Sequence, residues 1–474
     1  MAPTELKPDL CVIGAGSAGL SVAAGAVQMG ASVVLIERGE MGGDCLNYGC
    51  VPSKALLAAA KQAQSLRDGA KFGVQPVEPN VDFGAVMDHV HGVIAEIAPH
   101  DSQERFEGLG VTVIRAPARF VAPDCVEAGG SRVKARRFVI AVGSRPAVPP
   151  IPGLADAPYL TNETLFANRT LPRRLLIVGG GPIGMEMAQA FRRLGTGVTV
   201  LEARRALGRD DPELAAVALE RLRAEGVEIR ENAAVERIDH DGAAYRVTLA
   251  GGEAVDGDQL LVATGRMPNL EDLNLSAANV DHDANGVLVD RRLRSRSNPK
   301  VFAAGDVAGP YQFTHVAAYH AGVVIQNALF RLPAKADHSS VPWTTYTDPE
   351  LAQVGLTEIA ARERHGDGVN VLRAPFAEND RARAERRTEG LLKVVTDKRG
   401  RVLGAGAVGV GAGDLIVPWA LAVTRRDAAS RIARVIAPYP TRSEASKRAA
   451  GAFFTPKLYG TRVKWLVKML AKLG

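Results

Sequence analysis

Two cysteines near the amino terminus are the residues best suited to chemistry in this chain of 474 residues. Cys45 and Cys50 lie in the segment GGDCLNYGCVPSKALLAAAKQ, and Pro52 follows closely. Proline is tolerated only near a helix start, so both sulfur atoms should lie at a helix N-terminus, where the dipole favours a thiolate. The spacing permits a disulfide across one helical turn. We predict a redox-active pair; the alternatives are a zinc half-site or two buried thiols.

A glycine-rich turn precedes this pair. Residues 9–38 predict a buried strand, a turn, an Ala-rich helix and a second strand that ends at Glu37. Gly14, Gly16 and Gly19 fit the pattern GxGxxG, whose glycines permit a tight turn, the approach of a pyrophosphate and close helix packing. Glu37 can accept hydrogen bonds from both hydroxyl groups of an adenosine ribose. This βαβ unit therefore predicts a dinucleotide site.

The same unit occurs a second time. Its landmarks recur 165 residues later, in RRLLIVGGGPIGMEMAQAFRRLGTGVTVLEA, as Gly179, Gly181, Gly184 and Glu202. A chance glycine turn would not reproduce the strand, the helix and the terminal glutamate together. Two sites on one chain predict two dinucleotides.

A second element is also repeated. FVIAVGSRPAVP (138–149) and LLVATGRMPN (260–269) each predict an apolar strand that ends in a glycine, and we include these glycines, Gly143 and Gly265, among the candidate cofactor-binding residues. A proline-rich stretch after residue 148 marks a stiff connection between two domains.

Composition excludes several other classes of protein. At about 150 residues per domain the chain should form roughly three domains. Its contents of 46% hydrophobic and 23% charged residues exclude disordered and collagen-like chains. The net charge of +6 comes from scattered basic residues, so we expect no nucleic-acid partner. Because four cysteines are too few for a secreted disulfide scaffold, and no signal or membrane-spanning segment is evident, we predict a cytoplasmic protein.

With both fingerprints, the segment GGDCLNYGCVPSK closely resembles class I flavin-dependent pyridine nucleotide-disulfide oxidoreductases, the group of dihydrolipoyl dehydrogenase and mercuric reductase. FAAGDVAG (302–309) and FAENDRARAERRTEGLLKVV (376–395) match as well. The resemblance implies an α/β fold with two Rossmann-like domains, for FAD and NAD, a C-terminal α+β dimerisation domain, and a homodimer. We place the FAD domain at 1–150 and 275–338, the NAD(P) domain at 151–274, the dimerisation domain at 339–455 and a basic tail at 456–474.

The resemblance also implies roles for individual residues. Cys50 would lie against the flavin, and Cys45 would attack the substrate. Lys54 and Glu186 would form an ion pair beside the flavin, where a cation stabilises the reduced cofactor; the alternative is an unrelated surface pair. His315 lies near a helix start that faces the flavin, and we expect its imidazole to be structural. FAD would be held by Gly14, Gly16, Gly19, Glu37, Lys54, Gly143, Asp306 and the segment around His315, and the nicotinamide dinucleotide by Gly179, Gly181, Gly184, Glu202 and Gly265.

The choice between NADH and NADPH depends on one short segment. Glu202 would bind a ribose 2′-hydroxyl group and repel a 2′-phosphate, which favours NADH. Arg204, Arg205 and Arg209 follow it and could clamp a phosphate, so NADPH stays open. Pro182 stands where the family often has an aromatic gate over the nicotinamide.

The chain departs from the family near its C-terminus. Disulfide-reducing members carry a His-Pro-x-x-x-Glu motif, whereas this chain reads APYPTRSE, with Tyr439 in place of the histidine and Glu444 retained. A phenol with a pKa near about 10 accepts a proton poorly compared with an imidazole near about 6.5. We therefore keep dihydrolipoyl dehydrogenase activity only as an alternative to the main functional prediction.

Mercuric reductase resembles the chain in having this tyrosine. However, no cysteine follows Cys125, and we see no N-terminal metal-binding domain. We therefore predict an oxidised low-molecular-weight thiol or disulfide as substrate, because an acidic leaving thiol departs without a general acid. Soft-metal-ion reduction and a membrane-surface NADH:quinone or acceptor oxidoreductase are further alternatives.

The tail predicts a basic amphipathic helix. Val463, Leu466, Val467, Leu470 and Leu473 share one face, and Lys464, Lys468 and Lys472 lie elsewhere. Such a helix can lie on an anionic membrane, but we favour packing on the protein's own dimer.

Overall fold

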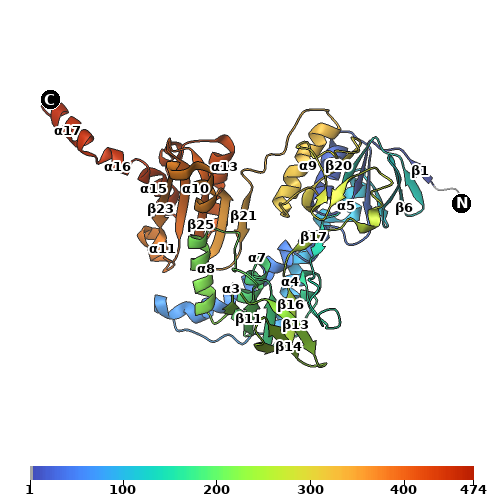
Figure 1. Ribbon diagram of the computed structural model, residues 1–474, viewed down its shortest axis with the longest axis horizontal. Coiled ribbons are helices and arrows are strands. Elements are labelled where there is room, and N and C mark those ends of the chain that lie inside the picture. Colours follow the sequence, from blue (N-terminus) through green and yellow to red (C-terminus); the bar gives the residue numbers. More distant parts are fainter. Residues whose placement is uncertain (1–3, 474) are drawn as a thin grey trace.

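The computed structural model describes residues 4–473, which form three bodies followed by a projecting tail (Figure 1). The first body is built on a five-stranded parallel sheet with the order β20-β8-β2-β3-β4. The central strands β2 and β3 are buried and are nearly continuous apolar runs, as expected for parallel strands, whereas the edge strand β4 is more exposed. The strands are β2 (Leu10–Ile13), β3 (Val33–Glu37), β4 (Thr112–Arg115), β8 (Arg137–Ile140) and β20 (Val301–Ala303).

Helices and a smaller sheet complete this body. Helices α1 (Ser17–Gln28) and α9 (Thr314–Ala328) pack against each other on one face. The small sheet contains β1 (Thr4–Leu6), β7 (Ser131–Val133), β6 (Cys125–Ala128) and β5 (Arg119–Ala122). Cys11 and Cys125 are buried in this body as free thiols and take no part in the cysteine pair.

The second body repeats the parallel sheet, here with the order β12-β11-β10-β16. Its strands are β10 (Arg174–Val178), β11 (Gly197–Leu201), β12 (Glu228–Arg230) and β16 (Gln259–Val262), and its helices are α7 (Pro182–Leu194) and α8 (Pro212–Ala224). A meander of β13 (Val235–His240), β14 (Tyr245–Leu249) and β15 (Ala254–Gly257) covers it. The two bodies are joined by the short antiparallel pair β9 (Ser144–Pro146) and β17 (Arg266–Pro268).

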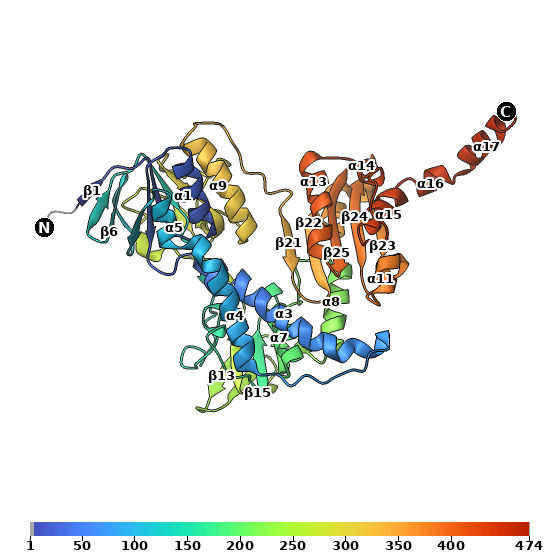
Figure 2. The same ribbon diagram turned by 180° about the vertical axis from the view of Figure 1, so that it is seen from behind.

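The helix that follows the cysteines leaves the first body. Helix α3 (Cys50–Arg67) packs between α4 (Phe83–Ile97) and α7, in an apolar cluster that includes Leu56, Ala60 and Phe191. Figure 2 shows α3 and α4 lying along the second body and reaching toward the first. The thiols therefore lie where the two bodies meet.

The third body is an antiparallel sheet with the order β21-β22-β25-β24-β23. Its helices cover the sheet, and α16 (Thr455–Leu458) and α17 (Thr461–Leu470) extend away from it in both views (Figures 1 and 2). The strands are β21 (Pro342–Thr345), β22 (Glu350–Gly355), β23 (Val369–Pro375), β24 (Leu391–Asp397) and β25 (Val402–Gly409). The helices are α10 (Glu358–His365), α11 (Asp380–Ala384), α12 (Ala412–Leu415), α13 (Val417–Arg425), α14 (Ala429–Ala433) and α15 (Glu444–Ala452).

This architecture confirms the predicted α/β fold class, whereas the predicted domain boundaries stay predictions. Among residues 4–473, no helix is both long and apolar enough to span a bilayer.

Candidate functional site

The two cysteines lie on separate helices, which corrects the prediction of a single helical turn. Cys45 belongs to α2 (Gly43–Asn47), and Cys50 is the first residue of α3. A continuous helix would need the Pro52 nitrogen to donate to the Tyr48 carbonyl, and proline has no such hydrogen. Instead, the Asn162 side chain donates to that carbonyl at 3.2 Å. Both cysteines are free thiols, with Cys45 half-buried and Cys50 exposed.

A hydrogen bond between the thiols makes them chemically unequal. It is the main cause that lowers the pKa of Cys50 to about 6; the Thr314 hydroxyl, 3.3 Å from the sulfur, and the charge of Lys54 also favour the thiolate. The same bond is the main cause that raises the pKa of Cys45, and burial adds to it. At neutral pH, Cys50 is therefore a thiolate that accepts a hydrogen bond from the Cys45 thiol.

Two hydroxyl groups beside the thiols were missed by sequence reasoning. Thr314 begins α9 and lies beside Cys50, and Ser17 begins α1 and stabilises a Cys45 thiolate. Thr314 is 264 residues from Cys50, so no local spacing connects them. The only available signal was that Ser17 lies within the first GxGxxG motif and Thr314 follows the motif around Asp306.

We expect Thr314→Val to raise the pKa of Cys50, by about one unit, because the substitution removes a donor to the thiolate. The rate of Cys50 alkylation by iodoacetamide should fall as pH decreases through about 6 in the wild type, and through a higher pH in the variant. Alkylation followed by peptide mass spectrometry between pH 4 and pH 9 measures both profiles. Thr314→Ser, which keeps the hydroxyl group, serves as the control, and superimposable profiles for valine and serine would contradict the assignment.

Lys54 and Glu186 form an ion pair, as the family resemblance implied, and Glu186 is buried, so this is not an unrelated surface pair. The Lys54 ammonium lies 2.8 Å from Glu186 Oε2, and Glu186 is buried. The other carboxylate oxygen of Glu186 accepts a hydrogen bond from the Tyr346 backbone N–H at 2.9 Å. Lys54 also lies 4.4 Å from the centre of the Tyr346 ring. This cluster joins α3, α7 and the third body beside the thiols.

A chain of polar contacts links the cysteine segment to the motif around Asp306. Asp306 is partly buried, which raises its pKa, and it accepts a hydrogen bond from Ser144 at 2.5 Å. Arg266 donates to Ser144 at 2.8 Å and pairs with Asp44 at 3.0 Å. Asp44 directly precedes Cys45, so this chain helps to position the thiols.

The first glycine turn has the geometry of a dinucleotide cradle. Gly14 has a φ of +104°, and a Cβ there would lie 2.4 Å from the Ala141 carbonyl oxygen. A Cβ at Gly16 would meet only Gly43, at 3.9 Å, so the turn is open at the start of α1. No side chain caps α1, so its N–H groups can receive a phosphate. Glu37 accepts hydrogen bonds from the Ala15 and Gly39 N–H groups, which holds its carboxylate at the turn.

Other residues predicted to hold the first cofactor lie at the same edge of the sheet. A Cβ at Gly19 would lie 1.8 Å from the Gly14 carbonyl oxygen, so only glycine permits this approach. Gly143 has open space around it and follows β8, and Asp306 follows β20. The first turn therefore fits FAD.

The second turn repeats this geometry. A Cβ at Gly179 would lie 2.4 Å from the Ala263 carbonyl oxygen, and one at Gly184 would lie 2.1 Å from the Gly179 carbonyl oxygen. Gly181 is open, so this turn too has room for a pyrophosphate. Glu202 accepts hydrogen bonds from the Gly180 N–H at 2.7 Å and from the Arg204 N–H at 2.8 Å.

The remaining residues of the second cofactor site do not decide between NADH and NADPH. The preference for NADH therefore stays a prediction. Gly265 has a φ of +143° and precedes β17. Arg204, Arg205 and Arg209 are exposed, and within residues 4–473 none of them forms an ion pair within 4.0 Å, although the charge of Arg209 acts on the neighbouring Asp210. Pro182 is the first residue of α7.

His315 has a structural environment. Its Nε2 lies 2.8 Å from the Pro342 carbonyl oxygen, and its ring stacks on Phe313 with centroids 5.2 Å apart. Burial lowers the pKa of His315, so the ring is neutral at pH 7 and donates to that carbonyl. The imidazole thus connects α9 to the third body.

Tyr439 and Glu444 lie apart from the thiols of their own chain. The exposed Tyr439 donates a hydrogen bond to Asp380 at 3.1 Å, which is the main cause that raises its pKa. Glu444 begins α15 and helps to line a surface cavity beside Asp380. Among the described residues, neither contacts Cys45 or Cys50. A role in catalysis would therefore require the thiols of a partner subunit.

Comparisons with known proteins identify relatives along most of the chain. The family model described as "Pyridine nucleotide-disulphide oxidoreductase" matches residues 8–321, and the model for its dimerisation domain matches residues 341–450. Mercuric reductase from Lysinibacillus sphaericus is 38% identical over 450 residues, covering 94% of this chain and 82% of the relative. Mercuric reductase from Streptomyces lividans is 36% identical over 461 residues, covering 94% and 96%.

Solved structures show the same architecture. The Cu(II) complex of the HOCl-induced flavoprotein disulfide reductase RclA from Escherichia coli is 30% identical, with a TM-score of 0.83 over 92% of this chain and 98% of RclA. LpdA from Mycobacterium tuberculosis is 26% identical, with a TM-score of 0.86 over 94% and 99%.

Proposed function

Because the chain belongs to the pyridine nucleotide-disulphide oxidoreductase family, we propose that it uses NADH to reduce an oxidised low-molecular-weight disulfide through Cys45 and Cys50. The family establishes an FAD-dependent enzyme that uses NAD(P)H, and its dimerisation domain supports a homodimer. The observation that carries the finer proposal is the pair of neighbouring free thiols, Cys45 and Cys50, in which contact between the two lowers the pKa of Cys50 and raises that of Cys45.

Each of the two glycine turns would bind one of the two cofactors. Gly14, Gly16, Gly19 and Glu37 would hold FAD, together with Gly143 and Asp306 at the same sheet edge. Gly179, Gly181, Gly184 and Glu202 would hold the nicotinamide dinucleotide. When bound, FAD supplies two-electron transfer between NAD(P)H and the cysteine pair.

The reduced pair would react with the substrate in two exchange steps. Transfer of the Cys45 proton along its hydrogen bond to Cys50 produces the attacking thiolate. Cys45 then bonds to one substrate sulfur, the substrate S–S bond breaks, and the first thiol leaves with a proton. Cys50, having given its proton to the first leaving group, attacks the Cys45 sulfur and releases the second substrate sulfur as a thiolate, which takes a proton from solvent. The products are two substrate thiols and a Cys45–Cys50 disulfide.

We expect the enzyme to prefer disulfides with acidic leaving thiols, because Tyr439 replaces an imidazole acid and hydrogen bonds to Asp380. The kcat/KM for an aromatic disulfide should exceed that for oxidised glutathione by about a hundredfold or more. Tyr439→His should narrow this gap, and Tyr439→Phe should leave it unchanged. Equal rates for both substrates in the wild type would contradict the proposal.

Soft-metal reduction is the second candidate, because two free thiols lie together and several relatives are mercuric reductases. Among the described residues, no group of three or more His, Cys, Asp or Glu could hold a metal ion. Cys45 and Cys50 would therefore bind the ion without further protein ligands of these types. Anaerobic turnover with Hg(II), Cu(II), quinones and disulfides ranks these candidates, and faster turnover of a metal ion than of any disulfide would favour this one.

We also propose that the tail contacts anionic membrane, which differs from the dimer packing that the sequence favoured. No residue of α17 is buried, and Trp465, Leu466 and Leu470 are exposed. No acidic residue follows Glu444, so the positive charge of the tail is uncompensated. The helix places an apolar face beside three lysines, which suits an anionic lipid surface.

Vesicle binding tests this contact. We expect the holoenzyme to co-sediment with phosphatidylglycerol vesicles and much less with phosphatidylcholine vesicles. Replacing Lys464, Lys468 and Lys472 with glutamine should weaken binding about a hundredfold, since each lysine near the surface contributes about 1 kcal/mol. Matched replacement of the exposed Lys61, Lys335 and Lys398 is the control. Unchanged binding after removal of residues 457–474, or loss of the dimer instead of lipid binding, would contradict the proposal.

A further inference from the structure

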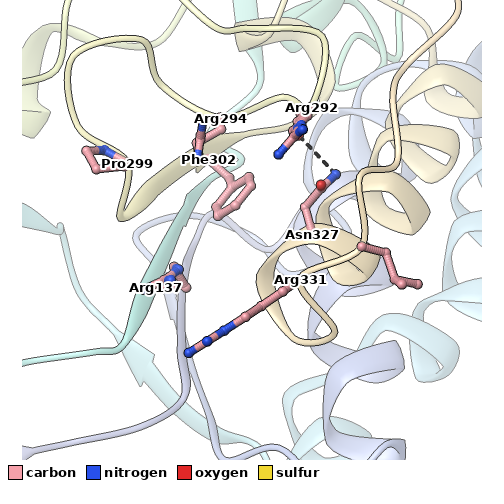
Figure 3. Close-up of a pocket in the computed structure, with 8 residues that line it drawn as sticks. Arg137, Arg292, Arg294, Pro299, Phe302, Asn327 and Arg331 are labelled. Carbon is pink, nitrogen blue, oxygen red and sulfur yellow. Dashed lines mark hydrogen bonds between the residues drawn. The ribbon is translucent and has the colours of Figure 1, made fainter.

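A cavity of about 420 Å³ lies on the first body, and its lining is rich in arginine. Figure 3 shows Arg331 extending from the end of α9 toward Arg137 at the start of β8, with the Phe302 ring nearby. We call it the arginine cavity. Its lining residues are Arg137, Arg292, Arg294, Pro299, Phe302, Asn327, Arg331 and Leu332.

The arginine cavity is separate from the predicted cofactor cradle. Arg137 begins β8, and Phe302 lies within the short strand β20. Gly143 and Asp306, by contrast, follow the carboxyl ends of these same two parallel strands. The cavity therefore lies toward the amino ends of the sheet, opposite the edge that fits FAD.

Positive charge in the cavity is largely uncompensated. No aspartate or glutamate lines it. Within residues 4–473, the guanidinium groups of Arg137, Arg292 and Arg331 form no ion pair, and that of Arg294 pairs only with Asp290, at 3.5 Å, whose carboxylate also accepts hydrogen bonds from the backbone N–H groups of Arg292 and Arg294. The pKa of Arg137 is lowered, first by burial and then by its neighbouring arginines. Like charges gathered in a concave site repel one another unless an anion binds among them.

Stabilisation of a helix end is the simpler explanation for such arginines, because the cavity adjoins the C-terminus of α9. The contacts do not support it. In the described part of the chain, none of the four guanidinium groups donates a hydrogen bond to a carbonyl of α9. Asn327 instead connects the end of α9 to the segment that follows it, because its side chain donates to the carbonyls of Val323 and Ala334.

We propose that the arginine cavity binds an oligophosphate group, either as inorganic oligophosphate or as the phosphate chain of a nucleotide. Guanidinium groups match phosphate oxygens with two parallel N–H donors, and several phosphates can engage several arginines at once. Apolar Phe302 and Leu332 also line the cavity beside the arginines. This binding is independent of the redox reaction.

Calorimetric titration of the FAD-loaded dimer with inorganic tripolyphosphate tests the proposal. We expect saturable binding in the wild type. The affinity should fall by about tenfold or more when Arg137, Arg292 and Arg331 are replaced with glutamine. Replacement of Arg119, Arg364 and Arg399, three exposed arginines without acidic partners, removes the same charge and should leave binding intact. Titration with ATP and with adenosine distinguishes the sources, because a nucleotide site would favour ATP over tripolyphosphate.

Thermal unfolding gives a second readout that does not depend on activity. Tripolyphosphate should raise the melting temperature of the wild type but not of the Arg137, Arg292 and Arg331 variant. Without phosphate, this variant should melt at or above the wild-type temperature because it has lost like-charge repulsion. The proposal would be overturned if the cavity variant and the control variant bound tripolyphosphate equally well. It would also be overturned if the wild type bound tripolyphosphate no more tightly than sulfate. A lower melting temperature of the phosphate-free variant would assign the arginines a structural role instead.

Discussion

Cys45→Ser is expected to lower NADH-dependent disulfide reduction by about a thousandfold or more, because serine cannot form the mixed disulfide with the substrate. Cys50→Ser should be equally slow for a different reason. Its Cys45 thiol can still attack, but no second thiol resolves the adduct. Intact-protein mass spectrometry should therefore detect a trapped substrate adduct with Cys50→Ser and none with Cys45→Ser.

The buried Cys125 provides a matched control for this prediction. Cys125→Ser removes a thiol from the same body without touching the pair, so its turnover should match the wild type. Circular dichroism and melting temperature check that each variant is folded. If Cys45→Ser reduced the disulfide substrate at the wild-type rate, the proposed role of the pair would be contradicted. Undiminished quinone reduction by that variant, with no disulfide reduction by the wild type, would favour the membrane-surface acceptor reaction.

Lys54→Met is expected to lower turnover by about a hundredfold, which corresponds to about 2.7 kcal/mol of lost electrostatic stabilisation. The substitution removes the cation that favours the Cys50 thiolate, at the position that the family resemblance places beside the flavin. It also leaves the buried Glu186 without its partner at 2.8 Å. Because Lys54 is partly exposed, we expect a loss of only about 1–2 kcal/mol in the free energy of unfolding.

A double-mutant cycle tests whether Lys54 and Glu186 act as a unit. Glu186→Gln keeps an oxygen for the Tyr346 N–H but removes the charge. The double variant should be little worse than Lys54→Met alone, because the lost interaction is shared. Lys61→Met, on the exposed side of the same helix, controls for loss of a lysine. Strictly additive effects on kcat/KM would show that the two residues contribute independently.

Local spacing was sufficient for the features that depend on neighbouring residues. The two GxGxxG turns were predictable because only glycine fits where a Cβ at Gly14 or Gly179 would collide with a carbonyl oxygen. The terminal glutamates Glu37 and Glu202 were predictable because each ends the second strand, 23 residues after the first glycine of its motif. The meeting of Lys54 with Glu186 followed only from the family resemblance, since 132 residues separate them.

Contacts between distant segments could not be predicted. Thr314 reaches Cys50, and Tyr346 contacts Glu186, only because three bodies converge around α3. The break between α2 and α3 follows from Pro52, but the donor to the freed Tyr48 carbonyl, Asn162, is 114 residues away and could not be predicted. The hydrogen bond from Tyr439 to Asp380 likewise joins the loop before α15 to the first residue of α11, two segments that are distant in the sequence.

The most direct test of the central claim follows the redox state of the cysteine pair during one catalytic cycle. Anaerobic holoenzyme would be sampled before NADH, after one equivalent of NADH, and after a subsequent equivalent of aromatic disulfide, with iodoacetamide labelling and mass spectrometry of the peptide that contains Cys45 and Cys50. We predict no label, then label on both cysteines, then no label again. Labelling that stays the same at all three stages, while the substrate disulfide is still converted to thiols, would contradict electron transfer through this pair.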